Sequence, residues 1–303
     1  MRLPGRPSFP VGPPVWPAAV NRPTESPCTG VHYNTGWART PTARLARALI
    51  VDDVLRPWVH ALGSPHVTGR DRLADLDAPV IFAANHHSHL DTPLVLTSLP
   101  TRFRHRAVVA AAADYFFTNR ARGALSALAI GAIPIERLKV NRRSSDLAAS
   151  LLEDSWNLVL FPEGGRSPDG WGQDFRGGAA YLAVRCGRPV VPVYVEGTRR
   201  VLRKGATLPT PVGSPFARGS GVRVTFGAPL RPTAGEDSRR FADRIESAVA
   251  AVGDETATDW WTARKRAAAG TTPPLTGPVI APWRRAWALG EGRRGTAQEP
   301  SWP

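Results

Sequence analysis

The stretch PVIFAANHHSHLDTPL, residues 79–94, decides the fold of this 303-residue chain. Residues 79–84 form a short apolar run between loop residues, which predicts a buried strand. Residues 85–91 are polar and contain three of the seven histidines of the chain. A helix is then expected to begin at about Pro93. A strand that enters a helix through a polar turn is typical of an α/β domain, in which ligands bind beyond the carboxyl ends of the strands.

Similar apolar runs and helical patterns alternate along the chain. Strands are predicted over residues 107–113, 132–135, 158–161 and 190–195, with an alternating, more exposed strand over 222–226. Helical spacing covers residues 144–154, 177–186 and 236–252. We therefore predict a single α/β domain with a mostly parallel central sheet that is flanked by helices on both faces.

The two ends of the chain differ in composition from this middle part. Residues 1–41 are rich in Pro, and residues 269–303 are rich in Pro, Gly and Arg. Such segments bury too little apolar surface to fold on their own, so a disordered leader and a disordered tail are expected. The folded domain is predicted over residues 42–268.

The charge balance favours an anionic partner. Lys and Arg number 39 against 25 for Asp and Glu, which gives a net charge of +14. Nucleic acid is not the expected partner, because the longest basic run is residues 264–266 and no nucleic-acid-binding signature is present. Two cysteines cannot build a disulfide framework, and a reducing compartment is expected. No apolar run reaches the length of about eighteen residues that predicts a membrane-spanning helix.

The histidine cluster permits two chemistries. In the first, the neutral imidazole of His86 takes a proton from a hydroxyl, and Asp91 orients the ring. A separation of five residues puts the two side chains about 140° apart on an ideal helix, so they meet only if His86 lies in the turn before it. In the second, residues 87–91 are a His-x-His-x-Asp metal site. That site needs more histidines, and the last one in the sequence is His105, so no metal is expected.

Four motifs, in order, resemble those of the glycerolipid acyltransferases of the lysophosphatidic acid acyltransferase type. The family motifs N-H-x-S-x-x-D and G-x-I-x-I-x-R are matched at residues 85–91 and 131–137. The third motif, F-P-E-G-T-R-S, is matched at residues 161–167 with Gly165 in place of Thr. A V-P-V run follows at residues 191–193, either as core or as lining of an acyl pocket.

The resemblance implies a role for each motif. His86 and Asp91 are expected to be the catalytic pair, with His86 as the general base. Two arginines are expected to hold the phosphate of the acceptor, and the third motif is expected to bind the acceptor. The substrate-binding residues expected on this basis are Arg137, Glu163, Gly164, Gly165, Arg166 and Ser167. Taken alone, Arg137 would suit a surface ion pair with Glu136 or Asp146 better than a phosphate contact.

The same resemblance implies an O-acyltransferase that moves a fatty acyl group from acyl-CoA or acyl carrier protein to a hydroxyl of a lysophospholipid. The first candidate for the acceptor is 1-acylglycerol-3-phosphate, which would give phosphatidic acid. Another polar-lipid acceptor, such as a glycolipid, and a non-catalytic lipid-binding relative are the alternatives. No cofactor is expected. A lipid acceptor implies a peripheral protein on the cytoplasmic side of the cell membrane.

Three segments are candidates for contact with a membrane surface. A helix over residues 43–62, kinked at Pro57, is expected to carry apolar side chains near one face: Leu45, Leu49, Val54, Trp58 and Leu62. Residues 123–135 are uncharged but too short to span a membrane. Two tryptophans and three basic residues lie within 260–266. The alternatives are ordinary packing against the sheet for the first two segments and a solvated helix end for the third.

Overall fold

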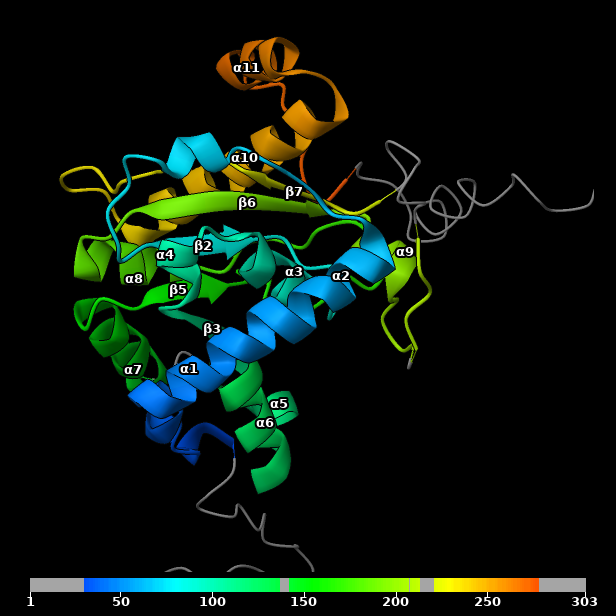
Figure 1. Cartoon of the computed structure of the whole chain (residues 1–303). Helices are drawn as coiled ribbons and strands as arrows, with labels where there is room; N and C mark the ends of the chain where they lie inside the picture. Colours follow the sequence, from blue (N-terminus) through cyan, green and yellow to red (C-terminus); the bar gives the residue numbers. More distant parts are fainter. Residues whose placement is uncertain (1–29, 137–141, 207, 213–220, 278–303) are drawn as a thin grey trace, which may run out of the picture.

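Seven strands form one sheet in the computed structural model, which describes residues 30–136, 142–206, 208–212 and 221–277 (Figure 1). The strand order is β1-β7-β6-β2-β5-β3-β4. β6 and β7 are antiparallel, and the other neighbouring strands are parallel. The strands are β1 (His66–Thr68), β2 (Ile81–Ala84), β3 (Ala107–Ala112), β4 (Ala132–Ile135), β5 (Asn157–Leu160), β6 (Val190–Glu196) and β7 (Arg223–Phe226). The predicted mostly parallel α/β sheet is confirmed.

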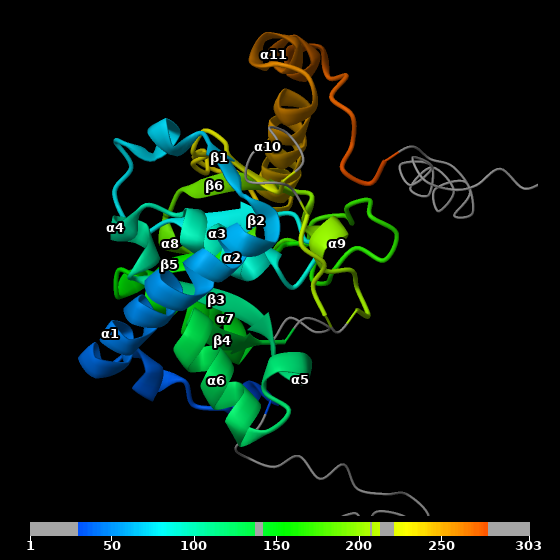
Figure 2. The same ribbon diagram turned by 45° about the vertical axis from the view of Figure 1, so that its right-hand side comes forward.

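Helices cover both faces of this sheet (Figures 1 and 2). One face packs against α2 (Arg56–Gly63), α3 (Asp91–Ser98) and α4 (Thr101–Arg104), and the other against α7 (Arg142–Glu153), α8 (Gly178–Cys186) and α10 (Ser238–Ala257). Successive side chains of a strand point to opposite faces, so Ile81 and Phe82 of β2 enter different core clusters. The remaining α-helices described are α1 (Pro41–Leu49), α5 (Ala113–Phe116), α6 (Arg120–Ile130), α9 (Thr198–Val201) and α11 (Trp260–Ala269).

The apolar runs of the sequence predict each of these strands except β1. β1 has three residues and no fully buried side chain, and it is held by its parallel pairing with β7. That pairing also encloses β7 between two neighbours. The predicted exposure of β7 is therefore wrong, since Val224, Thr225 and Phe226 are all buried.

One long helical element crosses the front of the domain in Figure 1 and consists of α1, the π-helical segment η3 (Ile50–Leu55) and α2. The predicted irregularity at Pro57 takes the form of this π-helical segment, in which the Arg56 N–H donates to the Val51 carbonyl five residues before it. Four of the five residues expected on one apolar face are exposed: Leu45 by 65%, Leu49 by 55%, Val54 by 60% and Trp58 by 41%. Leu62 is buried, as are Val51 and Val59 on the side that faces the domain.

Segments at both ends of the described chain pack against the domain. The Gly30 N–H donates to the Phe117 carbonyl over 2.8 Å, and the Tyr33 and Phe117 rings lie 5.3 Å apart. Near the other end, the Gly172 N–H donates to the Leu275 carbonyl over 2.8 Å. Contacts of the domain therefore begin before residue 42 and continue after residue 268. None of the helices in the described ranges combines the length and the apolar character needed to cross a membrane.

Candidate active site

His86 and Asp91 meet at the carboxyl end of β2. His86 lies in the turn that follows the strand, and Asp91 is the first residue of α3, which is the placement that their spacing requires. The His86 Nδ1 lies 2.8 Å from the Asp91 Oδ2. An ionised carboxylate only accepts hydrogen bonds, so Nδ1 carries the hydrogen of the neutral ring. Nε2 is left with its lone pair, as a base requires.

Asp91 is held in place by a buried hydrogen-bond network. Its Oδ2 also accepts the N–H groups of His87 and Ser88, both over 2.7 Å, and its side chain is completely buried. Burial by itself would raise the pKa of Asp91. The hydrogen bond and charge of His86, followed by the hydrogen bond from the Ser88 N–H, outweigh burial and lower this pKa below its ordinary value. Asp91 is therefore ionised and fixed in orientation at neutral pH.

The third motif clamps the main chain of His86 from both sides. Glu163 Oε1 accepts the His86 N–H over 2.8 Å, and the His86 carbonyl accepts the Ser167 N–H over the same distance. The ring of Phe161 stacks on the imidazole with centroids 4.2 Å apart and an interplanar angle of 23°. Since both ring and main chain of His86 are held, the direction of its Nε2 is set by residues 161–167.

Glu163 is a buried carboxyl group that joins two loops. Its Oε2 accepts the Gln173 N–H over 3.0 Å, while Oε1 binds His86, and only 2% of the residue is exposed. Burial raises the pKa of Glu163 to about 8, although both of these hydrogen bonds act to lower it. Glu163 is therefore a positioning residue, and its charge changes near neutral pH.

Two other polar residues of the first motif are structural. Asn85 joins β2 to β6 by two hydrogen bonds with the main chain of Val195, of 2.9 and 2.7 Å. Ser88 is fully buried and donates its hydroxyl to the Leu202 carbonyl over 2.7 Å. Neither side chain faces the cavity that His86 lines, so the geometry favours proton transfer by His86 over attack by the Ser88 hydroxyl.

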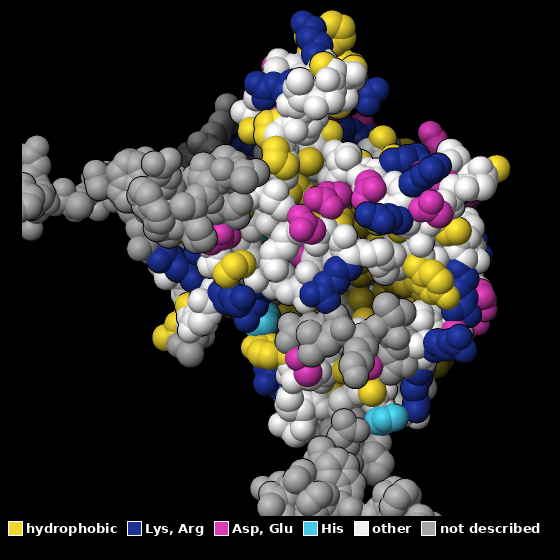
Figure 3. Space-filling view, turned by 180° about the vertical axis from the view of Figure 1, so that it is seen from behind, with side chains coloured by type: hydrophobic (Ala, Val, Ile, Leu, Met, Phe, Trp, Pro, Cys, Tyr) yellow, Lys and Arg dark blue, Asp and Glu magenta, His cyan; other side chains and the backbone are white. Residues whose placement is uncertain are grey.

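A cavity of about 760 Å³ opens at His86. This volume lies within the range of about 300–1,000 Å³ that ligand sites occupy. From behind the molecule, apolar side chains are seen in a hollow near its middle, with Lys and Arg side chains on either side (Figure 3). Most of the inner wall comes from small or aliphatic side chains of β3, β4, β5, α7 and α8: Ala110, Ala112, Ile135, Ala148, Leu158, Leu160, Ala179 and Leu182. The cavity thus offers an apolar chain a channel that starts beside the base.

Cationic side chains line the same cavity near the third motif. Arg166 is one of them, and Arg176 and Lys204 line the cavity as well; the sequence analysis gave no role to Lys204. The Lys204 ammonium donates to the Arg166 carbonyl over 3.1 Å, which ties the segment after α9 to the third motif. The Arg176 side chain can lie close to the turn because residue 164 is a glycine: its φ is +71°, and an added Cβ would lie 2.8 Å from the Arg176 Nε. These cations suit a phosphate group of a substrate.

The structure divides the predicted substrate-binding residues into two groups. Gly164, Gly165 and Arg166 line the cavity, whereas Glu163 and Ser167 are buried outside it and hold the His86 main chain. The expected contact of these last two side chains with the acceptor is therefore corrected to a positioning role. Arg137 lies outside the described residues.

The V-P-V run belongs to the core of the sheet. Val191 and Val193 of β6 are fully buried and do not line the cavity, so the acyl-pocket alternative for them is wrong. Pro192 lies inside the sheet, because β6 is placed between β7 and β2. The Pro192 carbonyl accepts the Gly227 N–H just beyond the last β6–β7 pair, Val193 with Phe226. A missing N–H at this end of the ladder costs no paired hydrogen bond.

Comparison with known protein families shows which class of protein this domain resembles. Residues 64–196 match the family model described as Acyltransferase. The matched residues include β2, the His86–Asp91 pair and the third motif, and the resemblance of the sequence to this family is confirmed. This part of the chain is similar to acyltransferase domains.

Individual relatives give the same class. The chain is 28% identical over 142 residues to 1-acyl-sn-glycerol-3-phosphate acyltransferase BAT2, chloroplastic, of Brassica napus, over 46% of this chain and 39% of that protein. It is 28% identical over 185 residues to the human 1-acyl-sn-glycerol-3-phosphate acyltransferase alpha, over 60% of this chain and 61% of that protein. A solved structure, the 1-acyl-sn-glycerophosphate (LPA) acyltransferase PlsC of Thermotoga maritima, shares the fold with a TM-score of 0.52 at 22% identity, over 72% of this chain and 81% of that chain.

Proposed function

We propose that this protein is an O-acyltransferase that acylates the free hydroxyl of 1-acylglycerol-3-phosphate and forms phosphatidic acid. The observation that carries the proposal is the orientation of His86, whose Nδ1 is bound to buried Asp91 while its ring lines an apolar cavity with cationic side chains. The names of the relatives support the same acceptor. The donor is a fatty acyl thioester of coenzyme A or of acyl carrier protein.

The reaction needs one proton transfer and one acyl transfer. His86 Nε2 takes the proton of the acceptor hydroxyl as its oxygen attacks the thioester carbonyl carbon. The tetrahedral intermediate then expels the thiolate by breaking the C–S bond, and the thiolate takes the proton from His86 and becomes the free thiol. Asp91 stabilises the imidazolium between the two steps. General-base help of this kind is worth about 10²–10⁴-fold in rate.

The two substrates differ in the part of the site that suits them. The apolar inner wall of the cavity suits the acyl chain of the donor, which buries its methylene groups there. Arg166, Lys204 and Arg176 suit the phosphate of the acceptor or the phosphates of the donor carrier. Holding the acceptor hydroxyl and the thioester together at His86 makes their reaction effectively unimolecular.

Access to a lipid acceptor requires contact with a membrane surface, and we propose a peripheral protein on the cytoplasmic side of the cell membrane. The exposed apolar face of the helical element, Leu45, Leu49, Val54 and Trp58, supports this contact. Trp260 and Trp261 of α11 support a second one: they are exposed by 53% and 60%, with Arg264 and Lys265 placed over their rings. Flotation with liposomes of neutral lipid, with and without added anionic lipid, tests this proposal.

Thiol release from acyl-CoA, measured with mass spectrometry across a panel of acceptors, tests the activity. The expected result is acylation of 1-acylglycerol-3-phosphate by the wild type and a loss of about 10²–10⁴-fold in His86→Ala. His66→Ala is the matched control, because His66 is exposed on β1 and lies outside the cavity. Retention of more than about a third of the activity in His86→Ala would exclude His86 as the base. If a glycolipid were the only acceptor in the panel to be acylated, it would replace 1-acylglycerol-3-phosphate as the proposed acceptor. If no acceptor were acylated, the result would favour a non-catalytic lipid-binding protein.

A further inference from the structure

His89 is a residue of the first motif for which the proposed reaction has no use. Its Nε2 lies 2.9 Å from the Tyr115 hydroxyl, and the two rings stack with centroids 5.1 Å apart. Phe116 packs edge-on against both, at 5.9 Å from His89 and 5.0 Å from Tyr115. The guanidinium carbon of Arg122 lies over the Tyr115 ring, 4.2 Å from its centroid. These side chains form one packed group on α5 and on the turns and helices beside it.

This group forms a wall between two cavities. The larger cavity is the one that His86 and Arg166 line. A smaller cavity of about 260 Å³ lies among α3, α5 and α6, and Arg122 and Pro93 line it without lining the larger one. The side chains that line both cavities are His89, Thr92, Tyr115, Phe116 and Ile130.

Each cavity carries its own cation next to this wall. Arg166 belongs to the larger cavity and Arg122 to the smaller one. Burial, followed by the charge of Arg166 and of other neighbours that include Arg122, lowers the pKa of His89 to about 4. The His89 ring is therefore neutral at physiological pH, and the positive charge beside the wall comes from the two guanidinium groups. An anionic group with an apolar chain suits this environment.

The proposed reaction brings two lipid chains to one base. The acyl chain of the donor and the chain already present on the acceptor need separate space. In the acceptor the phosphate is attached to the same glycerol as the apolar chain, whereas the phosphates of acyl-CoA are separated from the acyl chain by the pantetheine arm. The smaller cavity also lies beside the surface proposed to meet the bilayer. Its helix α6 packs against α1 and carries Leu125, which is 67% exposed (Figure 2).

We propose that the smaller cavity is part of the acceptor site: it binds the first carbons of the apolar chain of a lysophospholipid, whose glycerol extends past His89 into the larger cavity and brings its hydroxyl to His86. Its phosphate lies between Arg122 and Arg166, and the His89–Tyr115 wall separates it from the acyl chain of the donor. This inference rests on the proposed function. Arg122, Arg166 and the His89–Tyr115 wall would then select a single-chain anionic lipid as the acceptor.

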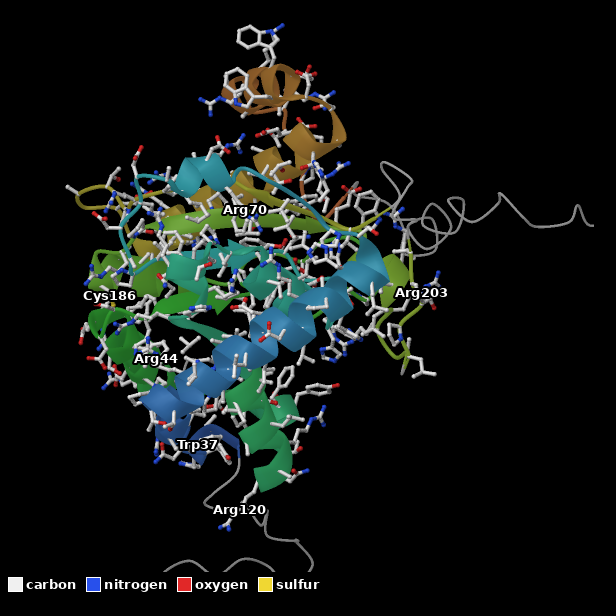
Figure 4. All side chains as sticks on the ribbon, viewed as in Figure 1. Trp37, Arg44, Arg70, Arg120, Cys186 and Arg203 are labelled. Atoms are coloured by element: carbon white, nitrogen blue, oxygen red, sulfur yellow. The ribbon has the colours of Figure 1, made fainter. Side chains whose placement is uncertain are left out.

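Binding without turnover tests the site directly. The probe is a short-chain lysophosphatidate, monomeric in water, titrated into the full chain carrying His86→Ala and followed by calorimetry. Adding Arg122→Ala is expected to weaken the affinity by about tenfold, because a charge-assisted contact is lost. Arg120→Ala is the matched control, since Arg120 lies on the same helix, is exposed, and points away from the domain in Figure 4. Its affinity is expected to stay within about twofold of the His86→Ala parent.

Kinetics separate the acceptor from the donor in the chain with His86 intact. Arg122→Ala and Tyr115→Phe are expected to raise the KM for lysophosphatidate by about fivefold or more and to leave the KM for acyl-CoA within about twofold. Ser145→Leu, which narrows the larger cavity alone, is expected to raise the KM for acyl-CoA instead.

Three outcomes would overturn the acceptor site: no binding of the probe by the His86→Ala parent, equal affinities for the Arg122 and Arg120 variants, or a raised KM for acyl-CoA in Arg122→Ala. Failure of the proposed function looks different. A chain that binds the probe through Arg122 but releases no thiol with any acceptor would keep the site and reject the acyl transfer.

Discussion

The turn after β2 and the turn after β5 lie side by side, but they use their polar side chains differently. The turn after β2 supplies His86, the proposed base, and its partner Asp91. The turn after β5 directs Glu163 and Ser167 away from the cavity and binds the His86 main chain with them, while Gly164 and Arg166 face the cavity. Residue type alone therefore does not distinguish a group that touches substrate from one that positions another group. Burial and hydrogen-bond partners make that distinction.

The largest effect is expected for the turn after β2. Asp91→Asn keeps the shape of the side chain but removes the charge that stabilises the imidazolium. The remaining amide oxygen can take the place of Oδ2, which accepts from His86, His87 and Ser88 in the wild type. We expect thiol release to fall by about 10²–10⁴-fold. Asp75→Asn, an exposed aspartate outside the cavity, should match the wild type. Equal rates in the two variants would remove Asp91 from the mechanism.

A smaller effect is expected for the turn after β5. Glu163→Gln can accept only one of the two N–H groups that Glu163 binds, so the His86 main chain loses part of its support. A displacement of the base by a fraction of an ångström should lower kcat by about 10–100-fold with little change in the KM of either substrate. Glu153→Gln, exposed at the end of α7, is the control. A raised acceptor KM with an unchanged kcat would instead show that Glu163 binds the acceptor.

The tight turn at Gly164 should contribute to stability. Gly164→Ala places a side chain at φ +71°, and its Cβ comes within 2.8 Å of the Arg176 Nε, so the free energy of unfolding should fall by about 1–3 kcal/mol. Gly178→Ala, at the start of α8, has nothing within 4 Å of its Cβ and should stabilise the protein by about 0.5–1 kcal/mol. Urea denaturation measures both. Similar losses in the two variants would contradict the role of the Gly164 turn.

The smallest effect concerns pH. The pKa of Glu163 is raised from 4.5 to about 8, so between these values the folded protein holds a proton that the unfolded chain has released. This group therefore stabilises the fold fully below about pH 4.5, and its contribution is lost as the pH rises through about 8. The free energy of unfolding of the wild type should fall more steeply than that of Glu163→Gln over this interval. Parallel profiles for the two proteins would show that Glu163 does not titrate there.

Local sequence patterns predicted much of the fold, because a buried strand needs a short apolar run and an amphipathic helix needs a period near 3.6 residues. β2, β3, β5 and β6 lie where these runs predicted them. β1 was not predictable in this way, since its three residues carry no apolar run and its conformation depends on pairing with β7, more than 150 residues later. The sequence did not predict whether Leu45 and Leu49 are buried or exposed either, because an apolar helix face can pack against the domain or against a membrane.

The order of residues along the chain by itself determined the pairing of His86 with Asp91, the proposed catalytic pair. A base and a carboxylate five positions apart, at the join of strand and helix, meet whenever that join forms. Only the tertiary structure decided what surrounds them: the clamp on His86, the alanine-lined cavity, and the His89–Tyr115 wall beside the smaller cavity. These features join segments that are from 26 to 77 residues apart, as in His89 with Tyr115 and His86 with Glu163. Contacts of this kind follow from the packing of helices on the sheet, which no local pattern encodes.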